Sequence, residues 1–197
     1  MNTRQLAIAS WANELLAGEF VIFDFETTGL DTQHDRIVQI GVIDHTGKSL
    51  IDTLVNAQVQ IPSEATAVHG ITNAQVADAP TFSDVYPAMF EALEGKVWVA
   101  YNIRFDEDFL IAECSRNWLT LPQPPKEPAP RDMFTQSYCA MNRYAAFWGE
   151  RRYGGGYRWQ RLGDACRQQK IEVNAAHSAL GDCLLTLELI KKMAGAS

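Results

Sequence analysis

Two carboxylates stand at the end of an apolar stretch, residues 20–30, which reads FVIFDFETTGL. The side chains of Asp24 and Glu26 are two positions apart, so in a β-strand they point to the same face. Acids at strand ends often simply face water. Held close together, however, two carboxylates provide the oxygen ligands that Mg²⁺ prefers, and the pair therefore indicates a candidate metal site.

Two further acids border the apolar faces of expected helices. Asp106 falls in the first turn of a helix expected at residues 104–119, beside Leu110, although an acid there also complements the helix dipole. Asp182 lies in a helix expected at residues 178–194 and shares an apolar stripe with the leucines one and two turns further on. A carboxylate on an apolar stripe needs a charged partner or a metal ion.

Convergence of these four acids would be unfavourable unless divalent cations neutralised their charges. Two Mg²⁺ ions about 4 Å apart can stabilise both the attacking and the leaving oxygen of an in-line phosphoryl displacement. His177 precedes Asp182 by five residues. A histidine, with an unperturbed pKa of about 6.5, can deprotonate an attacking water near neutral pH, although a lone histidine is more often structural. The five residues together indicate metal-assisted hydrolysis at phosphorus.

A sheet has to position such a site, and the apolar pattern locates its strands. The segment 20–25 is apolar on both faces until Asp24, which predicts a central strand. Segments 36–44 and 49–55 predict two more strands joined by a tight turn, hence an antiparallel meander, and a fourth strand is expected at 96–102. Helices are expected at residues 3–17, 83–95, 104–119, 132–144, 161–170 and 178–194, short helical pieces within 61–76, and loops at 121–131 and 145–159. This order predicts an α/β fold with a mixed central sheet flanked by helices.

Length and composition fit a single domain over residues 1–197, with a helical extension at 1–18 and a core at 19–194. No apolar run approaches the ~20 residues of a membrane span, and the amphipathic N-terminus does not resemble a signal peptide. The four scattered cysteines indicate free thiols and a cytoplasmic location. The formal net charge of −7 argues against a protein that binds nucleic acid over its whole surface, but allows phosphate contacts made through metal ions.

Four segments, taken together, resemble the motifs of the DEDDh 3′–5′ exonucleases. They read DFETTGL, VHGIT, YNIRFDEDFL and HSALGDC, and they occur in the order and rough spacing of that family, which includes the proofreading subunit of bacterial DNA polymerase III and ribonuclease T. The resemblance covers residues 19–194, and the closing segment 161–183 is especially similar to the proofreading subunit. It implies an RNase H-like sheet with helices on its faces.

The resemblance also implies a role for each of the chemically active residues. Asp24 would bridge two divalent cations, Mg²⁺ with Mn²⁺ able to substitute. Glu26 and Asp182 would hold the ion that binds the nucleophilic water, Asp106 would support the second ion, and His177 would be the general base. The tyrosine branch of the superfamily carries its tyrosine four residues before the last aspartate. Here that position is a serine, which favours the histidine branch.

Substrate contacts are implied at further positions. The backbone around Thr27 and Thr28 would meet the 3′-terminal nucleotide, and Leu30 and Ile71 would pack against terminal bases unless they simply fill the core. The other implied contacts are His69 and Asn102. The sequence departs from the family at Tyr101, where many members have histidine, so a substrate contact made there is in doubt. The proline-rich stretch before residue 132 implies a short or irregular fifth strand.

Arginines and aromatic residues alternate in the segment 143–161, RYAAFWGERRYGGGYRWQR, although the chain is acidic overall. Guanidinium groups can meet phosphates while rings stack on bases, so Arg151 and Arg152 are expected to contact a single strand. Two alternatives stay open: the aromatic residues complete the core while the arginines are solvated, or the segment contacts a protein.

The expected function is that of a metal-dependent 3′–5′ exonuclease acting on single-stranded or frayed nucleic acid. DNA is favoured over RNA by the resemblance of the closing segment, but related proteins process either, and an RNA-processing exoribonuclease is an alternative. Another is a non-catalytic module of the same fold that holds nucleic acid or a polymerase. The expected partner is a nucleic-acid 3′ end, with no membrane, and the sequence leaves a polymerase or other protein partner open.

Overall fold

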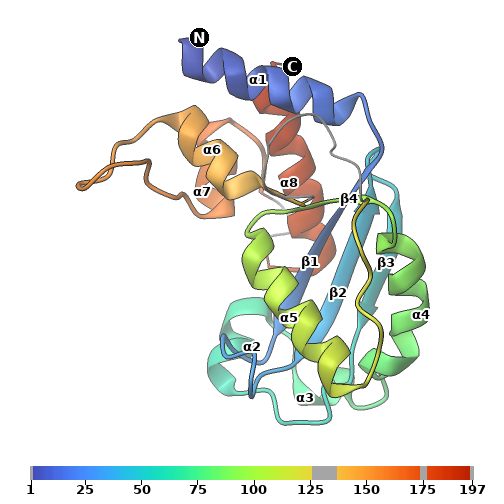
Figure 1. Cartoon of the computed structure of the whole chain (residues 1–197). Helices are drawn as coiled ribbons and strands as arrows, with labels where there is room; N and C mark the ends of the chain where they lie inside the picture. Colours follow the sequence, from blue (N-terminus) through green and yellow to red (C-terminus); the bar gives the residue numbers. More distant parts are fainter. Residues whose placement is uncertain (1, 126–136, 174–176, 196–197) are drawn as a thin grey trace.

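The computed structural model describes residues 2–125, 137–173 and 177–195. Within them a five-stranded sheet is covered by helices on both faces (Figure 1). The strands are β1 (Phe20–Thr27), β2 (Ile37–Asp44), β3 (Ser49–Leu54), β4 (Val97–Ala100) and β5 (Ser137–Cys139). The helices are α1 (Thr3–Leu16), α2 (Ser63–His69), α3 (Asn73–Val76), α4 (Phe82–Leu93), α5 (Ile103–Arg116), α6 (Ala140–Trp148), α7 (Leu162–Gln168) and α8 (Ala179–Ala194).

The sheet has the order β3-β2-β1-β4-β5, with β1 at its centre. Strands β1, β2 and β3 form the predicted antiparallel meander, whereas β4 runs parallel to β1 and β5 parallel to β4. The first four residues of β1 are all buried, as its apolar sequence predicts for a central strand. The predicted mixed sheet of RNase H-like type is therefore confirmed.

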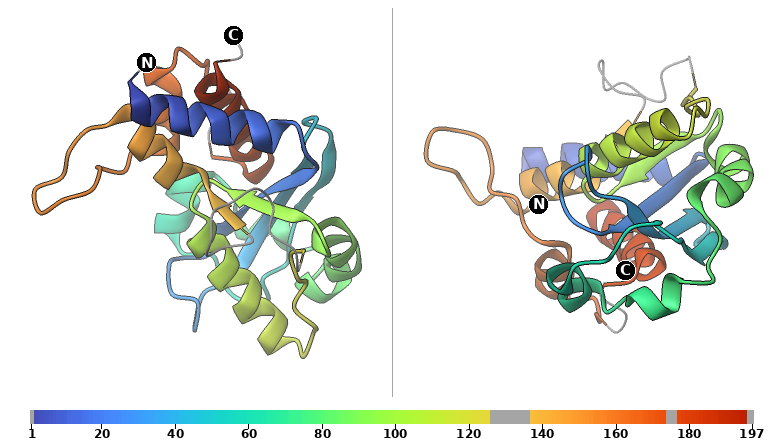
Figure 2. Two further views of the ribbon diagram at one scale, coloured as in Figure 1. Left: turned by 45° about the horizontal axis from the view of Figure 1, so that its top comes forward. Right: turned by 90° about the horizontal axis from the view of Figure 1, so that it is seen from below.

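Alternation along β1 divides the core into two layers. Phe20 and Ile22 point to the face that α1, α6 and α8 cover, and Val21 and Phe23 point to the face that α4 and α5 cover. The views in Figures 1 and 2 show these helices on opposite sides of the sheet. Because Asp24 and Glu26 continue the first series, they emerge beneath α8.

Helix α1 is part of this core. Its apolar stripe is buried in the same cluster as α8, and the side chain of Asn13 donates a hydrogen bond of 3.1 Å to the carbonyl of Ala194. The C-terminal half of α1 consequently lies against the C-terminal end of α8 (Figure 2). The division of the sequence at residue 18 stays a prediction.

The expected helix 132–144 was wrong at residues 137–139 and confirmed at residues 140–144, and α6 continues to Trp148, where a loop was expected. Residues 137–139 form β5 instead, paired with β4 through the register Trp98↔Ser137 to Ala100↔Cys139, and α6 begins only at Ala140. A three-residue strand has no periodicity of its own, so only its neighbour in the sheet defines it. The short fifth strand that the family resemblance implied is confirmed. Residues 126–136, which include most of the predicted proline-rich loop, lie outside the described residues.

Candidate active site

The carboxyl-terminal half of β1 carries Asp24 and Glu26 on one face, both partly buried. In the antiparallel register Asp24 lies opposite Gly41 of β2, and Glu26 lies opposite Gln39. Strand β1 thus fixes the spacing of the two acids, and the residues opposite them on β2 determine which element can pack over this face.

Gly41 lets the first turn of α8 rest directly on the sheet. A Cβ atom at this position would lie 2.5 Å from the carbonyl carbon of Ala179 and 2.5 Å from the nitrogen of Leu180. The backbone N–H of Ala179 donates to Oε1 of Gln39 at 3.1 Å, and the thiol of Cys183 reaches the Gly41 carbonyl at 3.5 Å. These contacts place the N-terminus of α8 against the two acids of β1.

Asp182 completes a cluster of three carboxylates. It lies in the first turn of α8, and one oxygen atom from each of Asp24, Glu26 and Asp182 falls within 4.8 Å of the others. The predicted convergence of these three acids is present in the structure. The N-terminus of a helix carries a partial positive charge, which favours negative groups at this position.

Asp106 approaches the cluster at the edge of β1 that lies beyond the end of β4. It is 2% exposed in the first turn of α5, and its Oδ1 accepts a 3.2 Å hydrogen bond from the N–H of Phe25, the residue between the two acids of β1. Its oxygens are outside the 4.8 Å group, but its charge is among the causes that raise the pKa of Asp24. The fourth predicted acid is therefore buried behind the other three.

The electrostatic environment disfavours four negative charges here. Burial is the main cause that raises the pKa of Asp24 well above its usual value, and the charges of Asp106, Asp182 and Glu26 add to it. Burial and Asp182 raise the pKa of Glu26 to about 7. Burial also raises the pKa of Asp182, against the effect of an N–H group and a charge from His177. The chain itself does not neutralise them, because no lysine or arginine of the described residues forms an ion pair with these acids.

His177 lies exposed immediately before Ser178, the N-cap residue of α8. Its backbone has φ +69, in the left-handed region, which costs on the order of 1 kcal/mol or more for a residue with a side chain. Its backbone N–H donates to the Asp182 carboxylate, so this conformation directly contacts one of the three acids. The imidazole is open to solvent beside these acids.

Thr27 ends β1, and Thr28 begins the loop that follows, which is closed by its own hydrogen bonds. Thr28 Oγ1 donates to Oδ1 of Asp35 at 2.9 Å and accepts the Arg36 N–H at 3.0 Å. A Cβ atom at Gly29 would lie 2.3 Å from the Asp35 carboxylate, so a larger residue here would displace the carboxylate that accepts the Thr28 hydroxyl. The loop is held rigidly beside the acids.

The remaining implied contacts differ in exposure. Leu30 is 84% exposed, so core packing is wrong for this side chain. Ile71 is 6% exposed and packs in a small buried cluster with residues of β2 and α3, so core packing is confirmed there.

His69 is buried and accepts the Ile71 N–H at Nδ1 (3.0 Å), while its Nε2 has no well-formed hydrogen bond among the described residues. Burial lowers the pKa of this ring, and the nearby Thr27 backbone partly opposes the shift.

Two neighbouring residues end β4 and lead into α5. Asn102 is exposed at the N-cap of α5, and its side chain makes no capping hydrogen bond. Tyr101, where many family members have histidine, is 8% exposed and donates its hydroxyl to the Gln160 carbonyl at 2.7 Å. Tyr101 is therefore an anchor for the segment that contains Gln160.

Sequence reasoning missed the residues that dock α8, Gly41 and Gln39. A signal was present, since a glycine inside a strand pattern often marks a close backbone approach. It did not show which element approaches, because Gly41 and Cys183 are 142 positions apart in the chain.

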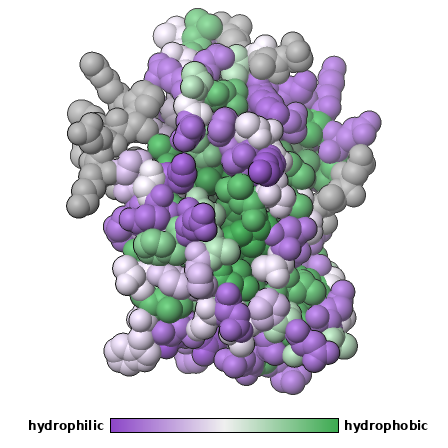
Figure 3. All heavy atoms as spheres, turned by 90° about the vertical axis from the view of Figure 1, so that its right-hand side faces the viewer, coloured by the Kyte–Doolittle hydropathy of each residue, from purple (hydrophilic) through white to green (hydrophobic). Residues whose placement is uncertain are grey.

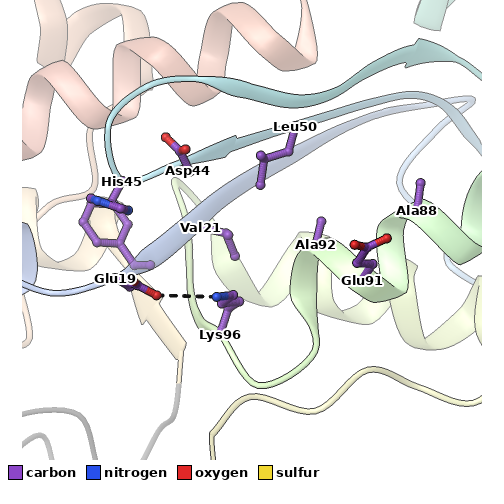
Figure 4. A pocket seen from close by; sticks show the side chains of 10 residues that line it. Glu19, Val21, Asp44, His45, Leu50, Ala88, Glu91, Ala92 and Lys96 are labelled. Carbon is purple, nitrogen blue, oxygen red and sulfur yellow. Dashed lines mark ion pairs between the residues drawn. The ribbon is translucent and has the colours of Figure 1, made fainter.

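A hollow of about 460 Å³ lies at the end of β1 opposite to the acid cluster. Figure 3 shows an apolar band on the side of the molecule that it faces. Figure 4 shows Val21, Leu50 and Ala92 around it, with an ion pair of 3.5 Å between Lys96 and Glu19 at its rim. No group of three potential metal ligands lies here within the described residues, so this hollow is separate from the acid cluster.

Across residues 2–125, 137–173 and 177–195, no helix combines the length and the apolar character that a bilayer crossing requires.

Comparison with known proteins agrees with the geometry. The family model described as Exonuclease, RNase_T, matches residues 21–190. The chain is 34% identical over 200 residues to the uncharacterized exonuclease CP81 of Escherichia phage 186, covering 98% of this chain and 97% of that protein. It is 30% identical over 177 residues to the DNA polymerase III subunit epsilon of Treponema pallidum, covering 88% of this chain and 75% of that protein.

Among solved structures, exonuclease X in complex with 5′-overhanging duplex DNA matches with a TM-score of 0.61 and 26% identity. The match covers 90% of this chain and 92% of that one. The family resemblance seen in the four sequence motifs is therefore confirmed, and this chain belongs to the exonuclease family.

Proposed function

We propose that this exonuclease is metal-dependent and removes nucleotides from the 3′ end of single-stranded or frayed nucleic acid, with DNA favoured over RNA. The observation that supports it most is the group of three carboxylates within 4.8 Å, contributed by β1 and the first turn of α8. A non-catalytic module of the same fold would not need this group together with a buried fourth acid.

The donor set fits divalent cations. All the candidate ligands are carboxylate oxygens, which Mg²⁺ prefers. Their raised pKa values mean that the ionised carboxylates are unfavourable without a cation, and a bound cation would offset this cost. In the proposal Asp24 holds both of two ions, Glu26 and Asp182 hold the first, and Asp106 supports the second. Bound there, such ions would stabilise the attacking and leaving oxygens of phosphodiester hydrolysis.

His177 is proposed to take the proton from the attacking water. Its ring is exposed at the edge of the cluster, whereas its backbone is fixed against Asp182. A histidine changes its protonation near neutral pH, so it can accept a proton and release it to solvent in each turnover.

The 3′-terminal nucleotide is proposed to lie against the loop after β1. The backbone of Thr27 and Thr28 is rigid there, and the exposed Leu30 offers an apolar surface for a base. His69 lies buried against the Thr27 backbone, and the exposed Asn102 makes no capping hydrogen bond among the described residues, so both are proposed as substrate contacts. DNA is favoured because the related exonuclease X was solved with DNA. A polymerase partner stays open, and a cytoplasmic location stays a prediction.

End-labelled oligonucleotides test polarity, substrate and metal in one series. With Mg²⁺ a 5′-labelled single strand should give a ladder that shortens from its 3′ end, EDTA should abolish it, and Asp24→Asn should do the same. Matched DNA and RNA strands decide the preference. Release of the 5′-terminal nucleotide first, or equal activity in EDTA, would contradict the proposal. Faster cleavage of RNA would favour the exoribonuclease alternative.

A further inference from the structure

A two-stranded arm, residues 149–161, extends from the body of the protein between α6 and α7. Figures 1 and 2 show it as the orange loop that projects away from the helices in every view. Its two sides pair through the Arg151↔Tyr157 bridge and a 2.9 Å hydrogen bond from the Arg158 N–H to the Glu150 carbonyl. Its tip is a triple glycine, residues 154–156, in which every φ is positive.

Two contacts with the body of the protein hold the arm, one at its base and one through the side chain of Tyr157, which follows the tip. Tyr101 donates its hydroxyl to the Gln160 carbonyl at 2.7 Å. On the other side, Arg4 of α1 lies over the ring of Tyr157 at 4.6 Å and donates to its hydroxyl at 3.0 Å. Gly149 makes room for this arginine, since a Cβ atom there would collide with the guanidinium group. The arm therefore has a fixed base and a tip free of packing contacts.

The arm is basic in an acidic chain. Four arginines and one glutamate give it a formal charge of +3, whereas the whole chain carries −7. Arg158 pairs with Glu150 at 3.0 Å, but neither Arg151 nor Arg152 forms an ion pair with a described residue, and both are exposed. Two of the three uncompensated positive charges are thus carried by adjacent side chains near the tip, and the third, Arg161, lies at the base.

Exposed aromatic rings accompany these charges. Tyr153 is fully exposed and Trp159 is 58% exposed, whereas Tyr144 and Phe147 of α6 are buried. Core packing is therefore confirmed for Tyr144 and Phe147 and wrong for Tyr153 and Trp159. Arg152 lies 5.8 Å over the ring of Trp159, so a charge and an aromatic face are presented together. Protein surfaces that bind single strands combine these features, because rings stack on bases and cations meet phosphates.

The arm also starts at the edge of the active site. Tyr101 directly follows β4, and β4 pairs in parallel with β1, which carries Asp24 and Glu26. About five residues separate the base of the arm from its tip, which at ~3.3 Å per residue gives a reach of about 17 Å. This corresponds to about five nucleotides of a stacked strand at 3.4 Å each.

From this placement we propose that the arm binds the single strand on the 5′ side of the nucleotide being removed, through Arg151 and Arg152 on phosphates and Tyr153 and Trp159 on bases. The inference rests on the proposed function, since it assumes that the 3′ end lies at the acid cluster. The arm then increases affinity for strands long enough to reach it and contributes little to the shortest substrates.

Binding is measured first, in an Asp182→Ala background with a 20-nucleotide DNA strand. Arg151→Ala with Arg152→Ala should reduce the steepness of log affinity against log salt concentration by about 1.4, about 0.7 per lost phosphate contact. The loss of affinity relative to the parent protein should therefore be about 25-fold larger at 0.1 M salt than at 1 M salt. Tyr153→Ala with Trp159→Ala should weaken binding at least about fivefold with the salt slope unchanged. Arg151→Lys with Arg152→Lys should retain the slope.

The matched control removes two positive charges far from the arm. Lys48→Ala with Lys96→Ala changes residues at the opposite end of β1, near the hollow of Figure 4, and should leave affinity and slope unchanged. If the arm and control variants behave alike, the proposal is overturned and the arm is a protein-contact element.

Kinetics in the wild-type background separate this inference from the proposed function. The arginine double variant should raise KM for a 20-nucleotide strand, and its loss of kcat/KM should be much smaller for a trinucleotide. An equal loss for both lengths would contradict binding upstream of the 3′ end. If the wild-type protein cleaves neither substrate, the proposed function fails, while the binding measurements still decide whether the arm contacts nucleic acid.

Discussion

Replacement of Gly41 by alanine should move Asp182 away from Asp24 and Glu26 although none of the three acids is changed. The new Cβ atom would lie 2.5 Å from the backbone of Ala179 and Leu180, and an ordinary contact needs about 3.4 Å. The neighbouring atoms are backbone and cannot rotate away, so the first turn of α8 has to move by about 0.9 Å. Asp182 lies in that turn and moves with it.

Two effects of different size are expected for Gly41→Ala. Overpacking of a core contact typically costs about 1–3 kcal/mol, which in a domain of this size lowers Tm by roughly 2–12 °C. Misplacement of a reacting group by about 1 Å can cost on the order of 10²-fold in rate. At 25 °C, where the variant is still folded, kcat/KM should therefore fall about 100-fold.

The assay pairs thermal unfolding with 3′-end cleavage and uses Gly163→Ala as the matched control. A Cβ atom at Gly163 meets only the flexible side chain of Arg167 at 3.4 Å, and alanine is the better helix former, so this variant should keep full activity with unchanged or higher Tm. A Gly41→Ala protein with kcat/KM within twofold of wild type would refute the reasoning that α8 positions Asp182 through this contact.

Four other predictions follow from the same geometry. Mg²⁺ or Mn²⁺ should raise Tm by mass action, and Asp24→Ala should reduce the rise; equal shifts would mean that the ions bind elsewhere. Without metal, stability should fall as the pH rises from about 4.5 through about 7, because the pKa of Glu26 is raised from 4.5 to about 7 in the fold, so the folded state binds the proton more tightly. Glu26→Gln should flatten this part of the pH–stability curve, and an unchanged curve would contradict the assignment. His177→Ala should lose about 10²–10⁴-fold in kcat while metal and oligonucleotide affinities persist; near-normal turnover would make this histidine structural. Leu30→Ala should raise KM with little change in Tm, whereas Ile71→Ala should lower stability by about 2–5 kcal/mol; a comparable loss of Tm in both would place Leu30 in the core.

The sequence predicted those parts of the fold that local pattern determines. The apolar runs of β1 and β2 and the turn before β3 located the meander, and the acids of β1 and α8 stood out because they interrupt apolar faces. The C-terminal end of α6 at Gly149, a left-handed C-cap, also had a signal, although the helix was expected to stop earlier.

The features that escaped prediction depend on contacts between distant segments. Strand β5 exists only through its pairing with β4, and the positive φ of His177 follows from how α8 begins above β2. Tyr101 was recognised as unusual for the family, but its partner Gln160 is 59 positions away. No local pattern encodes such pairs.

The docking of α8 on Gly41 also determines when the chain can become active during its synthesis. The contact between Gly41 and Cys183 joins residues 142 positions apart, and Asp182 is next to it. Translation makes the chain from its N-terminus, so β1 and β2 exist long before α8 does. A nascent chain on the ribosome therefore holds Asp24, Glu26 and Asp106 but lacks Asp182, so the cluster cannot assemble until α8 has emerged and folded back onto the sheet.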